Sequence, residues 1–372
     1  MRYRWIDNIE EFKQTAAEWD KALLDSGDYN PFLLSDFIMT WWKHFGTGRK
    51  LRIFTVYDDG RIAGGIPLYL AERGLNPLGF NVLHYIGDAA ANYTEPFYRA
   101  AETPVFTLLE EAITECGEID ALSLPNVRGE NGILREIRSA SRGKGSIRYA
   151  PQDHFNFAID LSSGKEAYFS GLSNELRTGL RRKRKRAVRD YGEVKLRRAG
   201  EEGELRSYLD HHVKYSIDAF RGRGRRNIIE DERYRSFFDE LFTLMGEKGR
   251  MDVYALYAGT SLIAVMLFYR FGKGFNWVFN SFDYDFRNVG PGYLLMEEVI
   301  YEILRQGESL CNCYGHESFF KKQWCNLQTP MYRVFTAKRS VRGSLYIFTQ
   351  KIIGTLRANK AVVSAARRIR KA

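Results

Sequence analysis

The sequence contains few cysteines and no long apolar run. Four cysteines occur in 372 residues, and the most apolar stretch, residues 255–271, is interrupted by Gly259, Thr260, Ser261 and Arg270. A membrane-spanning helix needs about 20 consecutive apolar residues, so this stretch is expected to form a β-hairpin. The charged N-terminal segment also lacks the apolar core of a signal peptide. These absences predict a cytoplasmic protein without structural disulfides.

The cysteines do not have the spacing of a metal site. Cys311, Cys313 and Cys325 occur near His316, so a zinc site has to be considered. Cys311 and Cys313 alternate along a strand-like run and are expected to share one buried face. A Cys-x-Cys pair without a second pair is a poor zinc signature. We therefore expect no metal cofactor.

Acidic residues are absent from the C-terminal segment, whereas basic residues are abundant. Residues 338–372 contain no Asp or Glu but ten Lys and Arg, and residues 177–189 contain eight basic residues in thirteen. The formal net charge of the chain is +10. Such a charge favours polyanionic partners, which include nucleic acid, anionic lipid and phosphate-bearing small molecules.

Hydrophobic spacing predicts a mixed α/β chain of two related halves. Each half is expected to contain helices, a β-meander, a further helix and a further strand. The first meander includes the hairpin turn Asp59-Gly60, and the second lies within residues 251–282. We expect an α/β (α+β) fold with domains at residues 1–150 and 151–335, followed by a basic amphipathic tail at 336–372.

Residues 287–292, Arg-Asn-Val-Gly-Pro-Gly, connect a strand-like run to a helix-like run at residues 293–306. Backbone N–H groups and the helix dipole favour an anion at a helix N-terminus. Glycines allow a ligand to approach the backbone closely. The segment is interpreted as a phosphate-binding loop, and the alternative is a simple Pro-Gly helix start.

The spacing Arg-x-x-Gly-x-Gly resembles the pattern by which GNAT acyltransferases hold the pyrophosphate of CoA. Together with five further segments, it resembles the CelD-like branch of the GNAT superfamily, which is related in architecture to the FemABX peptidyltransferases. The resemblance spans about residues 30–325. Its further segments are Asn30-Pro31-Phe32, Trp41-Trp42, Leu180 to Arg189, Pro291-Gly292-Tyr293-Leu294-Leu295 and Phe320-Lys321.

The resemblance implies two tandem GNAT-like domains, each with a mixed, mostly antiparallel sheet flanked by helices. It also implies acetyl-CoA or another acyl-CoA as co-substrate, and no metal. The residues expected to bind this donor are Arg287, Val289, Gly290, Gly292 and Tyr293.

Acyl transfer from a thioester to an amine needs a base, an acid for the departing thiolate and a hydrogen-bond donor to the thioester oxygen. Lys321 would, by resemblance, supply a cation to a phosphate or a developing oxyanion. Asn312 departs from the family pattern, which has an acid at this place. The alternative for each candidate is a helix cap or a solvated residue. The candidate catalytic residues are Asp88, Tyr93, Glu95, His316, Glu317 and Lys321, with Tyr314 as a further acid.

The acceptor site is expected to include Arg177, Arg181 and Trp41. Arginines of the basic helix could grip a phosphate or carboxylate of the acceptor. The alternatives are a solvated linker helix and a tRNA-binding surface. FemABX-type enzymes use aminoacyl-tRNA, but this sequence has no heptad arm of the kind that some of them carry, so nucleic acid is the less favoured partner.

The tail has apolar residues at helical spacing among basic residues: Leu345, Phe348, Ile352, Ile353 and Leu356. Such a helix can lie on an anionic membrane surface, which would place the protein at the inner face of the membrane. Alternatively, it packs on the protein and leaves its charges in solvent.

Three functions are consistent with the sequence. The first is an acyl-CoA-dependent N-acyltransferase that acetylates a small-molecule amine, such as an amino sugar of an envelope or polysaccharide precursor. The second is a FemABX-like, aminoacyl-tRNA-dependent peptidyltransferase. The third is a non-catalytic GNAT-like protein that binds polyanions or membranes.

Overall fold

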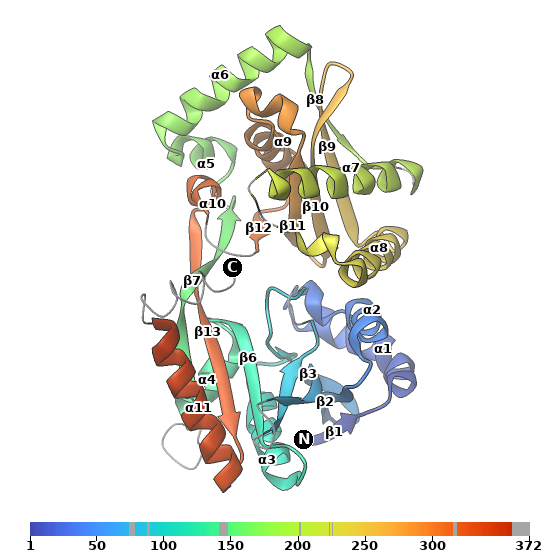
Figure 1. Cartoon of the computed structure of the whole chain (residues 1–372), viewed down its shortest axis with the longest axis vertical. Coiled ribbons are helices and arrows are strands. Elements are labelled where there is room, and N and C mark those ends of the chain that lie inside the picture. The colour runs from blue at the N-terminus through green and yellow to red at the C-terminus, as the bar shows by residue number, and fades with distance from the viewer. Residues whose placement is uncertain are drawn as a thin grey trace. The chain divides into compact units, whose positions relative to one another are not determined.

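The computed structural model describes residues 1–73, 79–87, 90–140, 148–200, 202–222, 224, 226–314 and 318–358 (Figure 1). The chain divides into two compact units. The first unit comprises Met1–Ser26, Gly46–Gln152 and Met331–Ala372, and the second comprises Gly27–Phe45 and Asp153–Pro330.

The units are not the contiguous ranges expected from the sequence, because residues 27–45 belong to the second unit. Aromatic packing explains this assignment. Phe32 lies 6.2 Å from Tyr269, and Phe37 lies 5.9 Å from Phe237, measured between ring centroids. Since Phe32 and Phe37 are fully buried, the segment completes the core of the second unit.

The first unit is a mixed sheet with the strand order β1-β2-β3-β4-β6-β13, and β5 pairs with β3. The β4–β6 pair is parallel, and the neighbouring pairs are antiparallel. The strands are β1 (Arg2–Ile6), β2 (Lys50–Asp58), β3 (Arg61–Arg73), β4 (Phe80–Tyr85), β5 (Phe97–Tyr98), β6 (Ala121–Arg128) and β13 (Leu327–Ala337). The helices are α1 (Ile9–Asp25), α3 (Val105–Glu115), α4 (Gly132–Ala140) and α11 (Val341–Ala358).

The predicted hairpin turn between β2 and β3 is confirmed. Asp58 pairs with Arg61, so Asp59 and Gly60 form a two-residue connection. Both have positive φ angles, 47° and 76°. A two-residue hairpin of this kind needs positive φ at both positions, which Asp-Gly tolerates better than most pairs.

The second unit has a mixed sheet with the strand order β7-β12-β11-β10-β9-β8, in which only β11 and β12 are parallel. Its strands are β7 (Arg148–Asp160), which starts in the first unit, β8 (Val194–Arg198), β9 (Met251–Ala258), β10 (Ser261–Phe271), β11 (Gly274–Phe282) and β12 (Leu310–Cys313). Its helices are α2 (Ser35–Phe45), α5 (Lys165–Gly171), α6 (Asn174–Tyr191), α7 (Glu202–Arg221), α8 (Glu232–Glu247), α9 (Pro291–Arg305) and α10 (Phe319–Trp324). Short 3₁₀ turns are η1 (Pro31–Leu33), η2 (Ile228–Glu230) and η3 (Tyr284–Val289).

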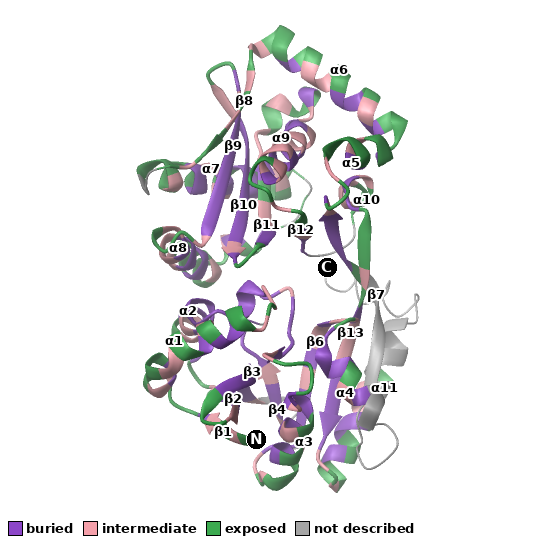
Figure 2. Ribbon diagram, turned by 180° about the vertical axis from the view of Figure 1, so that it is seen from behind, coloured by how far each residue is buried: buried purple, intermediate pink, exposed green. Residues whose placement is uncertain are grey.

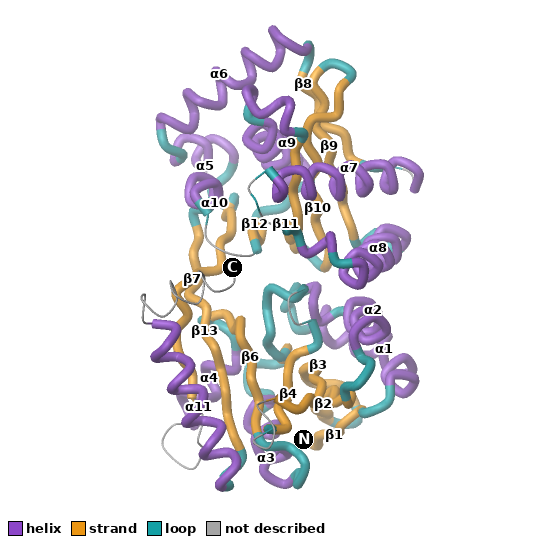
Figure 3. The backbone as a smooth tube through the Cα atoms, viewed as in Figure 1, coloured by secondary structure: helices purple, strands orange, loops and turns teal. Residues whose placement is uncertain are grey.

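Helix α9 connects the parallel strands β11 and β12, and all three are labelled in Figure 3. Its buried face, Leu294, Leu295, Met296, Val299 and Ile300, belongs to the core of this unit. The N-terminus of a helix in such a crossover lies at the carboxyl end of the preceding strand, where α/β proteins bind ligands. Within the described residues, no helix has both the length and the apolarity needed to cross a membrane.

Candidate functional site

A cavity of ≈ 580 Å³ lies at the start of α9 in the second unit. It is bounded by the end of β11, the first turn of α9, Tyr314 after β12, and α10. The residues predicted from the sequence that line it are Arg287, Gly290, Gly292, Tyr293, Tyr314 and Lys321. The structure thus brings together residues that are more than 30 positions apart in the chain.

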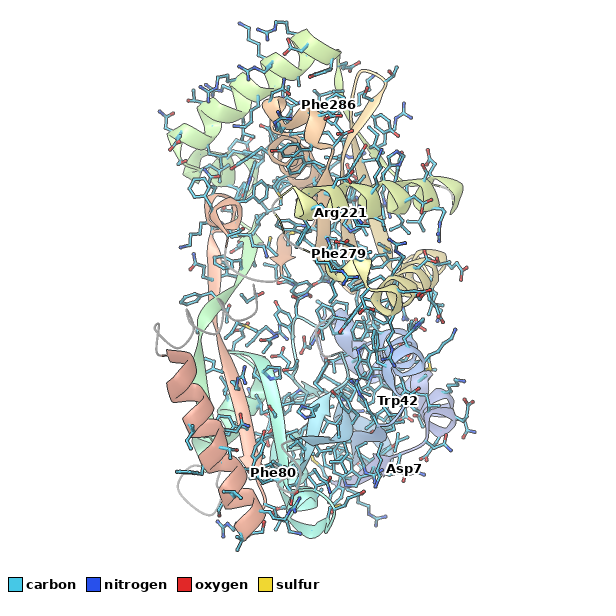
Figure 4. The ribbon with its side chains drawn as sticks, viewed as in Figure 1. Asp7, Trp42, Phe80, Arg221, Phe279 and Phe286 are labelled. Atoms are coloured by element: carbon cyan, nitrogen blue, oxygen red, sulfur yellow. The ribbon has the colours of Figure 1, made fainter. Side chains whose placement is uncertain are left out.

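A bulge in β11 shapes the wall of this cavity. Phe268 of β10 pairs with Trp277, whereas Leu267 pairs with Phe279, so Val278 has no opposite residue. Phe279, labelled in Figure 4, packs against Phe238 of α8, while Trp277 and Val278 line the cavity. A bulge re-aims side chains in this way and is common beside active sites.

The first turn of α9 is open to the cavity at Gly292. A Cβ atom built on Gly292 has Phe282 Cδ1 as its nearest neighbour, at 4.0 Å. The preceding Gly290 has φ 63° and ψ 59°, the left-handed conformation that ends η3 and starts α9. Pro291 follows at the first helical position, where its missing N–H costs nothing. The loop therefore has the geometry of an anion site: an accessible backbone at a helix N-terminus.

Two cations lie beside this loop, one of which the sequence did not single out. Arg287 donates to the Tyr284 carbonyl at 3.3 Å and lines the cavity. Lys183 reaches over from α6, where its Nζ lies 4.8 Å from the centre of the Tyr293 ring. Its stem is in contact with Gly290, since a Cβ built there would lie 2.6 Å from Lys183 Cε. Burial and, to a smaller extent, Arg182 lower the pKa of Lys183. A bound anion would raise this pKa again, because it stabilises the charged form of the lysine.

Helix α6 is fixed to the loop and to α9 by its own side chains. Arg186 donates to the Asn288 carbonyl at 3.2 Å, and Arg184 contacts Glu297 and Glu298 of α9 at 2.6 and 2.5 Å. Tyr191 packs on Phe286 of η3, with ring centroids 4.7 Å apart; Phe286 is labelled in Figure 4. These contacts hold the Lys183 side chain beside Gly290.

Arg177 and Arg181, which the sequence indicated for the acceptor, occupy other positions on α6. Arg177 is half-buried and Arg181 is exposed, and neither lines the cavity. Much of α6 is exposed, as Figure 2 shows. The signal that could have selected Lys183 is its place on α6 next to Ala187 and Gly179, which are buried residues of the packed face.

Lys321 is the most buried cation of the cavity. Ser318 caps α10 by accepting from the Lys321 backbone N–H at 3.2 Å, and Lys321 Nζ donates to the Tyr314 carbonyl. The ammonium lies 5.4 Å from the centre of the Trp277 ring. Burial lowers the pKa of Lys321. A cation held in this way can stabilise negative charge that develops on a bound ligand.

Asn312 stands where the family pattern has an acid, and its hydrogen bonds explain why an amide fits here. Asn312 Nδ2 and the Tyr314 hydroxyl both donate to Asn276 Oδ1, at 2.9 and 2.5 Å. Asn276 in turn donates through Nδ2 to the carbonyls of Tyr269 and Gly274. A carboxylate at position 312 would have no proton to donate to Asn276 Oδ1, so the amide fits this network.

The remaining predicted residues lie elsewhere. Val289 and Trp41 are buried in the second unit, where Trp41 packs on Phe45 at 5.4 Å, and neither lines the cavity. Tyr93 and Glu95 belong to the first unit.

Glu95 is fully buried and ion-paired with Arg128, which also donates its backbone N–H to Glu95 at 2.9 Å. The Arg128 guanidinium lies 4.5 Å from the centre of the Tyr93 ring. These contacts give Glu95 and Tyr93 structural partners within the first unit. Asp88, His316 and Glu317 lie outside the described residues.

The buried-face prediction for the cysteines is confirmed. Cys311 and Cys313 are both fully buried on β12, and burial raises the pKa of the Cys313 thiol. A thiol in this state is a poor metal ligand, because metals bind the thiolate.

Residues 174–322 match the family described as an acetyltransferase (GNAT) domain. This range contains every residue that lines the cavity. No curated protein matches the sequence.

Solved structures share the fold over nearly the whole chain. FemX matches with a TM-score of 0.60 at 11% identity, over 94% of this chain and 99% of that one. A conserved protein of unknown function from Bacteroides thetaiotaomicron has a TM-score of 0.57 at 10% identity, over 91% and 100%. L-PGS from Bacillus licheniformis has a TM-score of 0.54 at 13% identity, over 91% and 96%.

Identities this low show a common fold alone. The predicted fold class, two mixed α/β units in tandem, is confirmed. Residues 174–322 thus match a GNAT acetyltransferase domain, and the chain shares the fold of FemX over both units.

Proposed function

We propose that the protein is an acyl-CoA-dependent N-acyltransferase whose donor binds in the cavity at α9. The observation that carries the proposal is the accessible helix N-terminus at Gly292, flanked by Arg287 and Lys183. Backbone N–H groups, the helix dipole and two cations together suit a pyrophosphate. The aromatic side chains of Trp277, Tyr293 and Phe320 line the rest of the cavity and suit an apolar pantetheine arm.

The reaction forms a C–N bond and breaks the thioester C–S bond. The acceptor amine attacks the carbonyl carbon and loses a proton to a base, and the CoA thiolate leaves and takes up a proton. Lys321 is proposed to stabilise the negative charge on the carbonyl oxygen, and Tyr314 to protonate the thiolate. His316 and Glu317, which follow Tyr314 in the sequence, are the candidate bases nearest to these residues in the chain.

The proposed acceptor is a small-molecule amine, such as an amino sugar of an envelope or polysaccharide precursor. The acyl group is proposed to be acetyl. Both parts of the proposal rest on the family resemblance.

Calorimetric titration with acetyl-CoA tests the donor. Arg287→Ala should weaken binding about tenfold, since a charge-assisted contact is worth about 1.5 kcal/mol or more. Arg305→Ala is the control, because Arg305 lies in the last turn of α9, at the end away from the cavity, and pairs with Glu302. If acetyl-CoA and CoA both fail to bind the intact protein, the proposal is wrong.

A second function, aminoacyl-tRNA-dependent transfer, is favoured by two observations. FemX shares the fold over 99% of its length, and α6 presents Arg181, Arg182 and Lys185 to solvent. Transfer of a labelled amino acid that stops after RNase treatment, with no transfer from acetyl-CoA, would establish this function and exclude the first.

A further inference from the structure

Helix α11 has two apolar faces on opposite sides. Tyr346 and Ile347 are buried in a cluster of the first unit with Phe80, Ala121 and Phe335. The Tyr346 and Phe80 rings lie 5.6 Å apart, and Phe80 is labelled in Figure 4. This face fixes α11, the red helix of Figure 1, to β4, β6 and β13.

The opposite face is apolar and exposed. Val341, Leu345, Phe348 and Ile352 have exposed fractions of 87%, 37%, 58% and 43%. Their spacing of four, three and four residues puts them on one stripe of the helix. A continuous exposed stripe of this kind marks an interaction surface, whereas apolar residues scattered singly over a surface do not. We call these four residues the α11 stripe.

The segment of sequence that contains the stripe carries charge of one sign. Residues 338–372 contain ten basic and no acidic residues, and five of the basic residues follow residue 358. Two of the basic residues near the start of α11 have partners within the first unit. Arg342 pairs with Asp120 at 3.0 Å, and Lys338 donates to the Cys116 carbonyl at 3.1 Å. The basic residues at positions 351, 357, 360, 367, 368, 370 and 371 are the further charge of this segment.

An apolar stripe together with positive charge favours one class of polyanionic partner over another. A nucleic acid would match the charge, but duplex backbone contacts leave four apolar side chains in water. An anionic bilayer matches both features, because an amphipathic helix inserts its apolar side chains at the acyl boundary while Lys and Arg contact lipid phosphates.

We propose that α11 is a peripheral membrane contact, in which the α11 stripe enters an anionic lipid surface and the basic residues after it bind the headgroups. The proposal is independent of the donor cavity, so acetyl-CoA binding and membrane binding can fail separately. It would hold the first unit at a lipid surface.

Cosedimentation of the full chain with vesicles tests the proposal. The vesicles are pure phosphatidylcholine or contain about one third phosphatidylglycerol. We expect binding to the anionic vesicles, with weakening at high salt. The variant Phe348→Ser/Ile352→Ser should reduce the partition coefficient at least about tenfold, because binding scales with inserted apolar area. Neutralising Arg367, Arg368 and Arg370 should reduce it by about fivefold per charge.

Leu24→Ser is the control, since Leu24 is 48% exposed on α1 of the same unit and lies outside the stripe. It should leave binding unchanged, and thermal unfolding should show that all variants fold. The proposal is overturned if the protein does not bind anionic vesicles, or if the stripe variant binds like the wild type. It is also overturned if light scattering shows that a second copy covers the stripe, as a dimer that Phe348→Ser/Ile352→Ser dissociates.

Discussion

Replacing Gly292 by alanine should separate donor binding from protein stability. A Cβ atom at this position meets nothing closer than Phe282 Cδ1 at 4.0 Å. Gly292 is the second residue of α9, and alanine is favoured over glycine in helices by up to about 1 kcal/mol. The variant should therefore unfold at the same temperature as the wild type or slightly above it.

Donor affinity should change in the opposite direction. The added methyl group would occupy the space through which a phosphate reaches the Gly292 N–H. This is the first N–H group of α9, since Pro291 has none and the N–H groups of Tyr293 and Leu294 donate to the Gly290 carbonyl. Loss of one charge-assisted hydrogen bond costs about 1.5–3 kcal/mol, which corresponds to about a 10- to 150-fold increase in Kd. Gly292→Val should show a larger increase, since its side chain fills more of the cavity.

Calorimetric titration with acetyl-CoA and thermal unfolding by circular dichroism measure the two effects. Gly117→Ala is the control for an open glycine, because a Cβ there meets nothing within 4 Å and Gly117 lies in the first unit. Gly290→Ala should behave differently, since its φ of 63° and the Lys183 contact predict a loss of about 1–2 kcal/mol of stability. A Gly292→Ala protein that binds acetyl-CoA within about twofold of the wild type would refute the placement of the donor.

Three further predictions concern the same unit. Lys183→Met should weaken acetyl-CoA binding about tenfold, whereas Lys185→Met, at an exposed position of α6, should not; equal Kd values by calorimetry would contradict a role for Lys183. Asn312→Asp should lower stability by about 1–3 kcal/mol in urea unfolding, because the carboxylate faces Asn276 Oδ1; unchanged stability would show that Asn276 reorients. Burial lowers the pKa of His212 from 6.5 to about 4. As the pH drops, this histidine is therefore protonated in the unfolded chain before it is protonated in the folded protein. The free energy of unfolding should fall by up to about 3 kcal/mol between pH 6.5 and pH 4. His212→Gln should flatten that fall, and an unchanged slope across urea titrations at pH 7, 5.5 and 4.5 would count against it.

The turns and helix starts of this chain could be predicted from the sequence because each depends on neighbouring residues. Asp59-Gly60 forms the expected hairpin turn with positive φ at both residues. Residues 287–292 open a helix as expected, although α9 begins at Pro291 rather than at residue 293, and Cys311 and Cys313 are buried as their alternation indicated. In each case the backbone preferences of a few consecutive residues decide the outcome.

The cations and aromatic residues of the site could not be selected in the same way. The sequence indicated a basic helix at α6, but which of its cations reaches Gly290 depends on how Leu176, Leu180 and Ala187 seat the helix in the core. Trp41 and Val289 were candidate ligand contacts, yet their side chains fill the interior. Hydrophobic periodicity predicts which face of a helix is buried, but it does not predict which residues of other elements contact the side chains outside that face.

By itself, the sequence determined the element types, the glycine-containing loop at residues 287–292 and the concentration of positive charge in two segments. Only the tertiary structure decided that Lys183 joins that loop, that Asn312 belongs to an amide network, and that α11 keeps one apolar face exposed while it buries the other. Local backbone preference is encoded by adjacent residues, whereas these contacts join segments that are far apart in the chain and are fixed by the packing of whole elements.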